Sequence, residues 1–132
     1  MITLSDGQTI VELPEDLYWS DEFIWSAVEQ SAIYSVTGAL IIQTGKKLAG
    51  RPITLQSHDG QSAVASRETM AKLQAWRNTP SQRLTLDMPD YGHTATVMFR
   101  HQDGAVEAEP LVFYSDPVSG DYVFPVLRFF EV

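Results

Sequence analysis

The stretch SVTGALIIQTGKKLAGRPITLQS, residues 35–57, places three glycines and the first basic residues of the chain between two runs of strand-forming residues. Upstream of it, apolar and polar residues alternate from Ala27 onward, which is the period of a β-strand. Gly45 and Gly50 provide the backbone freedom that a chain reversal needs. The pattern therefore predicts one long hairpin that begins near Ala27, has its tip at residues 43–50 and returns through residues 52–56.

An acidic segment precedes this hairpin. Two short apolar runs flank the turn-forming residues 5–8, which indicates a pair of short strands. Pro14 and the small polar residues that follow it favour an irregular connection. Trp19, Phe23 and Trp25 are expected to anchor this connection in the core.

Residues 66–78 break the β pattern. Met70, Leu73 and Trp76 recur every three residues and would form one apolar face of a helix. Ser66 is placed to cap the helix N-terminus, and the segment ends shortly before a proline. The spacing predicts an amphipathic helix of about three turns.

The rest of the chain returns to the strand pattern. Further strands are expected in RLTLDM, TATVMFRH, AVEAEPLVFY and YVFPVLRFFEV, with turns at residues 102–104 and 115–121. We expect a mainly β protein, either an antiparallel β-sandwich or a partly closed barrel, with one α-helix at about 66–78. The whole chain, 1–132, is expected to be a single domain, with an acidic N-terminal segment at 1–26 and a β core with the helix at 27–132.

The composition is that of an ordinary globular protein. At 132 residues, with 44% hydrophobic and 20% charged residues, the chain is long enough to bury a core but short for two domains. It contains no cysteine, which excludes disulfides and thiolate zinc sites. No basic stretch followed by an apolar run opens the sequence, and no apolar run approaches the roughly 20 residues of a membrane span. We expect neither a signal peptide nor a membrane association.

Charge is distributed in three blocks. Residues 1–45 carry seven acids and no base, residues 46–102 carry eight bases and four acids, and residues 103–132 carry six acids and one base. A net charge of −8 argues against binding to the DNA backbone, because that affinity comes from basic groups that displace counterions. Blocks of opposite sign can neutralise each other within one fold or pair between neighbouring copies.

Motifs for phosphate binding and for nucleophilic hydrolysis are missing. Around Gly45 and Lys46 the P-loop pattern fails, because Leu40 stands where its first glycine belongs and Lys47 where it needs Ser or Thr. No GxSxG motif is present to mark a hydrolase. We therefore expect no catalytic and no cofactor-binding residues.

Histidines and carboxylates invite a metal site or a catalytic pair. The neighbouring His and Asp residues are His58 with Asp59, His93 with Asp90, and His101 with Asp103. All fall at predicted turns, where these residue types commonly serve as solvated turn residues, and no HExxH spacing exists. Glu107 and Glu109 share a face of a predicted strand, but a solvated face beside basic residues explains them better than a carboxylate dyad. We expect no metal site.

The order of these features resembles a known family. A strand hairpin ending in GRPITL, one short amphipathic helix, the run VMFRHQDGAVEAEPL and a closing aromatic strand YVFPVLRFFEV are similar to small tail proteins of long-tailed bacteriophages. The similarity is to distal-tail and minor tail-tip proteins, whose domains share the β-barrel or sandwich of the tail-tube protein. It spans residues 35–132, and the acidic first thirty residues depart from the pattern.

This resemblance implies a structural virion protein of a phage tail, made in the bacterial host cytoplasm and located in the virion. It implies a homo-oligomeric ring at the tail tip or an extension of the tail tube, in contact with other phage tail proteins, with no enzymatic activity and no cofactor. DNA would pass through the lumen without specific binding, repelled by an acidic wall. At the hairpin tip, we expect inter-subunit contacts from Lys46, Lys47 and Arg51. Their partners would be residues 12–22 or the C-terminal acidic block of a neighbouring copy.

Two other classes of function remain open. A small-ligand-binding β-barrel would use Trp19, Trp25, Trp76 and Phe99 as a pocket lining, although core packing also explains these aromatic residues. A small enzyme without a recognisable motif is the second alternative. It lacks any visible set of converging acid, base and nucleophile.

Overall fold

The computed structural model describes residues 2–57, 63–112, 115–118 and 120–132. Within these residues, nine strands form one antiparallel sheet, in the order β2-β1-β8-β9-β11-β6-β3, with β7 and β10 also paired to β11. Two further strands pair only with each other. The strands are β1 (Ile2–Ser5), β2 (Ile10–Leu13), β3 (Leu17–Trp19), β4 (Val28–Tyr34), β5 (Leu40–Lys46), β6 (Pro52–Ser57), β7 (Ala65–Ser66), β8 (Leu84–Met88), β9 (His93–Phe99), β10 (Val106–Pro110) and β11 (Tyr122–Glu131).

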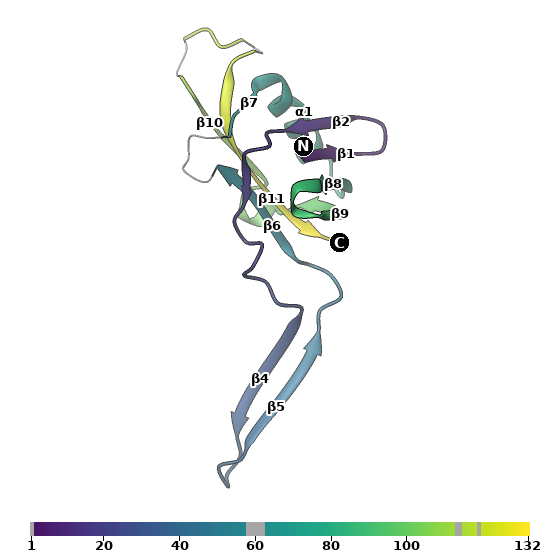
Figure 1. Ribbon diagram of the computed structural model, residues 1–132, viewed down its shortest axis with the longest axis vertical. Helices are drawn as coiled ribbons and strands as arrows, with labels where there is room; N and C mark the ends of the chain where they lie inside the picture. Colours follow the sequence, from purple (N-terminus) through teal and green to yellow (C-terminus); the bar gives the residue numbers. More distant parts are fainter. Residues whose placement is uncertain (1, 58–62, 113–114, 119) are drawn as a thin grey trace.

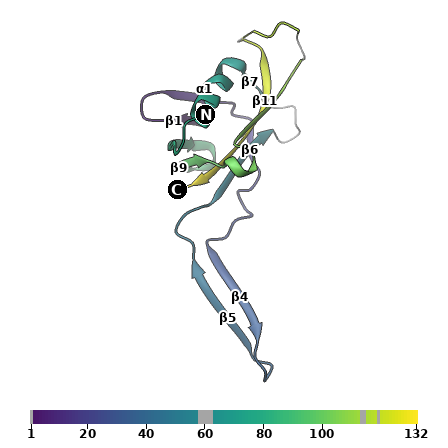
Figure 2. The same ribbon diagram turned by 180° about the vertical axis from the view of Figure 1, so that it is seen from behind.

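The molecule has a body and an arm. Figure 1 shows the large sheet and the helix gathered in the body, while the β4–β5 hairpin projects away from it as a long arm. Figure 2 shows the same separation from behind. The prediction of a mainly β protein with antiparallel sheets and one helix is confirmed, and the large sheet does not close into a barrel.

Strand β11 organises the large sheet. One of its edges pairs first with β7 and then with β6, and the other pairs first with β10 and then with β9. Between β9 and β10 the chain makes a short 3-10 turn, η2 (His101–Asp103), which Gly104 closes at a φ of +84°. This turn lies where the sequence predicts one, at residues 102–104.

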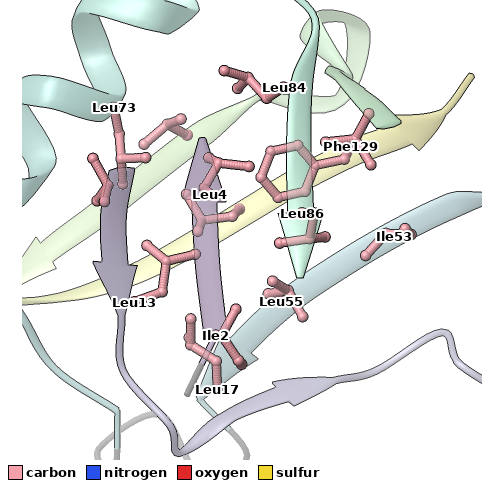
Figure 3. Close-up of a cluster of buried hydrophobic side chains, with 14 of the residues drawn as sticks. Ile2, Leu4, Leu13, Leu17, Ile53, Leu55, Leu73, Leu84, Leu86 and Phe129 are labelled. Carbon is pink, nitrogen blue, oxygen red and sulfur yellow. The ribbon is translucent and has the colours of Figure 1, made fainter. Parts of the chain in front are cut away.

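The core lies on one face of the large sheet. Alternate residues of its strands turn toward this face, as the period of a strand requires. Figure 3 shows the centre of the cluster, where the buried side chains of β1, β2, β3, β6, β8 and β11 meet. Phe129 is fully buried there and stacks on Phe99 with ring centroids 5.1 Å apart.

Helix α1 (Arg67–Arg77) covers part of this core. Ser66 caps it by accepting a hydrogen bond from the backbone N–H of Thr69 at 3.2 Å. Met70, Leu73 and Trp76 are its buried residues, as their spacing predicts. The predicted helix is therefore confirmed, both in its bounds and in the face that it buries.

The turn between β1 and β2 is tied to the helix through Asp6. Backbone N–H groups of Thr9 and Gln8 donate to its Oδ1 at 2.7 and 2.8 Å, and Trp76 Nε1 donates to its Oδ2 at 3.3 Å. These donors hold the pKa of the Asp6 carboxyl below its ordinary value of 3.8, the bond from Thr9 contributing most.

This lowered pKa predicts a small dependence of stability on pH. A carboxyl that binds its proton less readily in the folded state stabilises the fold above its unfolded pKa, and this contribution is lost as the pH falls through the folded pKa. Asp6→Asn is therefore expected to be slightly less stable than the wild type near neutral pH, and the difference should shrink in strong acid. Urea unfolding of both proteins, near neutral pH and in strong acid, measures the difference between their free energies of unfolding. An equal difference at both values would contradict it.

The N-terminal segment belongs to the core, which differs from the expected division at residue 26. Strands β1, β2 and β3 all contribute buried residues, including Ile2, Leu4 and Trp19. Acidic residues of this segment occupy exposed positions such as Glu12, so its net charge says nothing about whether the segment packs inside. The expected anchoring by Phe23 is wrong, because that side chain is 90% exposed.

The tip of the hairpin also differs from the prediction. The chain reverses at residues 35–39, where Ser35 N–H donates to Ala39 O at 2.8 Å and Gly38 N–H donates to Ser35 O at 3.0 Å. Gly38 adopts a φ of +84° there, the conformation that glycine tolerates best. Gly45, in contrast, lies inside β5, opposite Glu29 of β4. The predicted tip at residues 43–50 is therefore the return path to the body.

Candidate assembly interface

The arm and the segments that join it to the body carry more than half of the exposed large apolar side chains in the described part of the chain. Every residue of β4 and β5 is exposed. Of seventeen large apolar side chains exposed in the described part of the chain, ten lie between residues 23 and 48. They are Phe23, Ile24, Val28, Ile33, Tyr34, Val36, Leu40, Ile41, Ile42 and Leu48. Apolar surface gathered in this way is typical of a site that contacts another protein, a membrane or a ligand.

A hairpin of two strands gains little stability by itself. An isolated two-stranded hairpin is marginally stable in water, because it has no second layer against which to bury its side chains. The arm pairs seven residues of β4 with seven of β5, and its outer edges carry no further strand within the described residues. Exposed strand edges of this kind offer backbone donors and acceptors to another chain. Within the described chain, the arm thus leaves both its strand edges and its apolar side chains uncovered.

The apolar residues are concentrated in the distal half of the arm, residues 32–42. The strand register places Ala32, Tyr34, Leu40 and Ile42 on one face, and Ile33 and Ile41 on the opposite face. The proximal half, residues 28–31 and 43–46, has mainly polar side chains on both faces. The side chains thus change from polar to apolar along the length of the arm, whereas its two faces are alike.

The arm leaves the body at a root formed by residues 21–27 and 47–51. Arg51 is central there: its guanidinium carbon lies 4.5 Å from the Trp19 ring centroid and 5.8 Å from that of Trp25. Its Nη2 donates to the carbonyl oxygen of Glu22 at 2.8 Å. Because Trp19 is buried in the body, this stacking ties the root of the arm to the core.

The two lysines that the sequence places at the tip lie instead where the arm meets the body. Lys47 Nζ pairs with Glu29 Oε2 at 3.3 Å and lies 5.7 Å from the Trp25 ring, and its backbone N–H donates to Ala27 O at 2.7 Å. Lys46 is exposed at the end of β5, and within the described chain no hydrogen bond or ion pair holds its side chain. Lys46 is thus the more accessible of the two to a neighbouring copy.

The outer face of the large sheet, turned away from the core, has a hollow of about 290 Å³. It is lined by Gln56, Ser57, Glu107, Ala108, Glu109, Phe124, Pro125 and Val126. Glu107 pairs with Arg128 at 3.3 Å, and both glutamates are exposed, which confirms the solvated face beside a basic residue that the sequence predicts. The lining of the hollow thus combines apolar side chains with two carboxylates.

The four aromatic residues considered as a pocket lining do not share a pocket. Trp19 and Trp25 flank Arg51 at the root, whereas Trp76 packs into the core from the helix and Phe99 stacks on a core phenylalanine. None of the four lines the hollow on the outer face.

The described histidines also have partners in the fold. His93 Nε2 lies 3.2 Å from Glu131 Oε2, and the His101 ring lies 6.3 Å from the Phe99 ring. Among residues 2–57, 63–112, 115–118 and 120–132, no three His, Asp or Glu side chains gather as a metal site. His58 and Asp59 lie outside these residues. Within the described residues, no helix is long and apolar enough to cross a bilayer, and α1 has 11 residues.

The sequence alone had no signal for two parts of this interface. The root stacking joins residues far apart in the chain, and the hollow forms only when β6, β10 and β11 lie side by side. The two-faced apolar character of the arm did have a signal, the three consecutive residues Leu40, Ile41 and Ile42. Comparison of the chain with protein-family models, with curated proteins and with solved structures finds no match.

Proposed function

We propose that this chain is a structural subunit that assembles with copies of itself through its arm, as a ring-forming tail-tip or tube-extending component of a phage tail. The observation that carries the proposal is the arm, whose seven-residue strands are exposed throughout and hold apolar residues on both faces. A subunit of a ring needs a surface that fits a different surface of the next copy, and a projecting arm on a separate body supplies such a pair.

A second observation supports assembly. β2 lies at the end of the strand order of the large sheet, and Ile10 on this strand is 66% exposed. Open strand edges are usually protected in monomers, since they invite pairing with other chains. An assembled protein tolerates them because a neighbouring subunit covers them.

The charge of the chain fits a passage for DNA. With a net charge of −8, an assembled tube would present a mainly acidic surface, which repels the phosphate backbone. No ligand or cofactor enters this proposal. The subunit would act by its shape and its contacts alone.

The proposal is tested by deleting the gene in its parent phage or prophage. The expected result is filled heads with defective, non-infectious tails, seen by electron microscopy and by plaque counts. Restoring the gene on a plasmid is the control, and it should restore normal tails. Infectious particles with normal tails in the absence of the protein would overturn the proposal.

Reversing the charge of Lys46, where the arm joins the body, is expected to weaken assembly moderately. Lys46 is free to meet an acidic surface of a neighbour, and an exposed ion pair contributes about 0–1 kcal/mol, repeated at each contact. Lys46→Glu should therefore lower self-association most clearly at low salt and leave the melting temperature nearly unchanged. Sedimentation velocity at two salt concentrations measures the effect. If Lys46→Glu assembles as the wild type does at low salt, Lys46 is only a solvated residue.

Lys47→Glu serves as the matched comparison. Lys47 already pairs with Glu29 within the same chain, so its reversal places like charges together at the end of the arm. Lys47→Glu should weaken assembly and also loosen the pairing of β4 with β5. Lys46→Glu should weaken assembly without loosening this pairing. Amide exchange rates of β4 and β5 separate the two.

A further inference from the structure

The distal half of the arm is apolar on both faces, which sets it apart from a strand pair that lies on the surface of a partner. Such a pair needs one apolar face against its partner, and its other face is normally polar and solvated. In this arm, Ile41 faces one way and Ile42 the other, and their cross-strand partners Ile33 and Ala32 extend the two apolar faces. Covering one face would leave the other in water.

The proximal half shows the opposite pattern. Gln43 and Thr44 follow directly along β5, again on opposite faces, and pair with Ser31 and Gln30. Polar side chains on both faces suit a segment that crosses water. The boundary between apolar and polar character thus runs across the arm.

We infer that the distal half of the arm inserts between surfaces of other copies of this chain and is covered on both faces, while the proximal half spans the gap as a stalk whose side chains, apart from Lys46, stay in water. The inference rests on the proposed function and adds how the contact is made. It predicts a contact that depends equally on residues that point in opposite directions.

The charge distribution favours contacts between the arm of one copy and the body of another. Residues 21–51, the arm with its root, carry three basic and three acidic residues and have no net charge. The rest of the chain carries six basic and fourteen acidic residues, a net charge of −8. Two bodies therefore repel each other, whereas a neutral arm approaches the body of another copy without this repulsion.

The hollow on the outer face is an acceptor of suitable chemistry. Its lining combines apolar side chains, including Phe124 and Val126, with the Glu109 carboxylate, and it lies on an otherwise acidic body. Tyr34, 75% exposed in the distal half, combines an apolar ring with a hydroxyl that can donate to a carboxylate. We therefore assign one of the two covering surfaces to this hollow.

Four single lysine substitutions in the intact chain test the insertion. Ile41→Lys and Ile42→Lys put a charge on opposite faces of the distal half, and Gln43→Lys and Thr44→Lys do the same on the stalk. Sedimentation velocity should show self-association weakened by about tenfold or more for both isoleucine variants, because each would bury an unpaired charge. Both stalk variants should associate as the wild type does. Thermal melting of each variant confirms that the body is folded.

The outcomes separate the insertion from the function. Sensitivity of only one isoleucine would overturn insertion and leave assembly through the arm intact. Insensitivity of both would overturn the role of the arm altogether. A wild-type chain that stays monomeric at its highest soluble concentration would overturn the choice of a second copy.

The acceptor is tested by a charge reversal on the body. Glu109→Lys should weaken self-association, and Asp16→Lys, a charge reversal at an exposed position of the body that neither lines the hollow nor lies on an edge strand, should weaken it less. Equal effects of the two would show that the charge of the body matters but the hollow does not, and would overturn the assignment of the acceptor.

Discussion

Removing the arm is expected to abolish self-association and to leave the body folded. Ala27 and Lys47 are already joined by a hydrogen bond of 2.7 Å, so an Asn-Gly turn can replace residues 28–46 between them. None of the residues removed belongs to the buried core. The shortened chain should therefore melt within about 5 °C of the intact one and sediment as a monomer.

The control for this deletion is Gln43→Lys, a substitution on the solvated stalk that keeps the whole arm. This variant should retain both the fold and the association. If the shortened chain still assembles as the intact one does, the contacts between copies lie on the body and the arm has another role. If it fails to fold, the arm stabilises the body, which contradicts the separation described above.

Phe129→Ala is expected to destabilise the body by about 3–5 kcal/mol, because it leaves a cavity at the centre of the core. Phe129 is fully buried, stacks on Phe99 and lies on β11, the strand from which both halves of the sheet extend. Chemical denaturation measures the loss as a lower midpoint of unfolding.

The neighbouring residue provides a matched control. Phe130 has the same side chain but lies on the outer face, half-buried beneath the Arg100 guanidinium at 5.7 Å. Phe130→Ala should be clearly less destabilising than Phe129→Ala. Equal losses from the two substitutions would contradict the placement of the core on one face of the sheet.

Local patterns explain why much of the fold could be predicted. The helix has a cap at Ser66 and an apolar stripe through Met70, Leu73 and Trp76, so local signals and tertiary packing agree. The later strands follow the alternation that buries one side of β8, β9 and β11. In these segments each side chain's environment is decided by its near neighbours in sequence.

The arm could be recognised as a hairpin, but its turn could not be placed. Gly45 and Gly50 were expected to provide the reversal, whereas the pairing of β4 with β5 along seven residues places it at Gly38. A turn at Gly45 would have left shorter strands to pair. Register is a property of the whole hairpin, which single turn residues do not reveal.

The exposure of the arm could not be predicted from the sequence. Apolar strands are normally read as core, and the run Leu40, Ile41 and Ile42 is what a fully buried strand looks like. In the isolated chain these residues are about half exposed. The proposed assembly would bury them against a second copy.

The most direct measurement is a photochemical cross-link from the arm. A benzophenone amino acid in place of Tyr34 would stand in the distal half, which Figure 1 shows far from the body of its own chain. The account predicts a covalent dimer on irradiation, with the cross-linked peptide of the second copy coming from β10 or β11. Irradiation that gives no cross-linked dimer, at concentrations where the wild type associates, would contradict it.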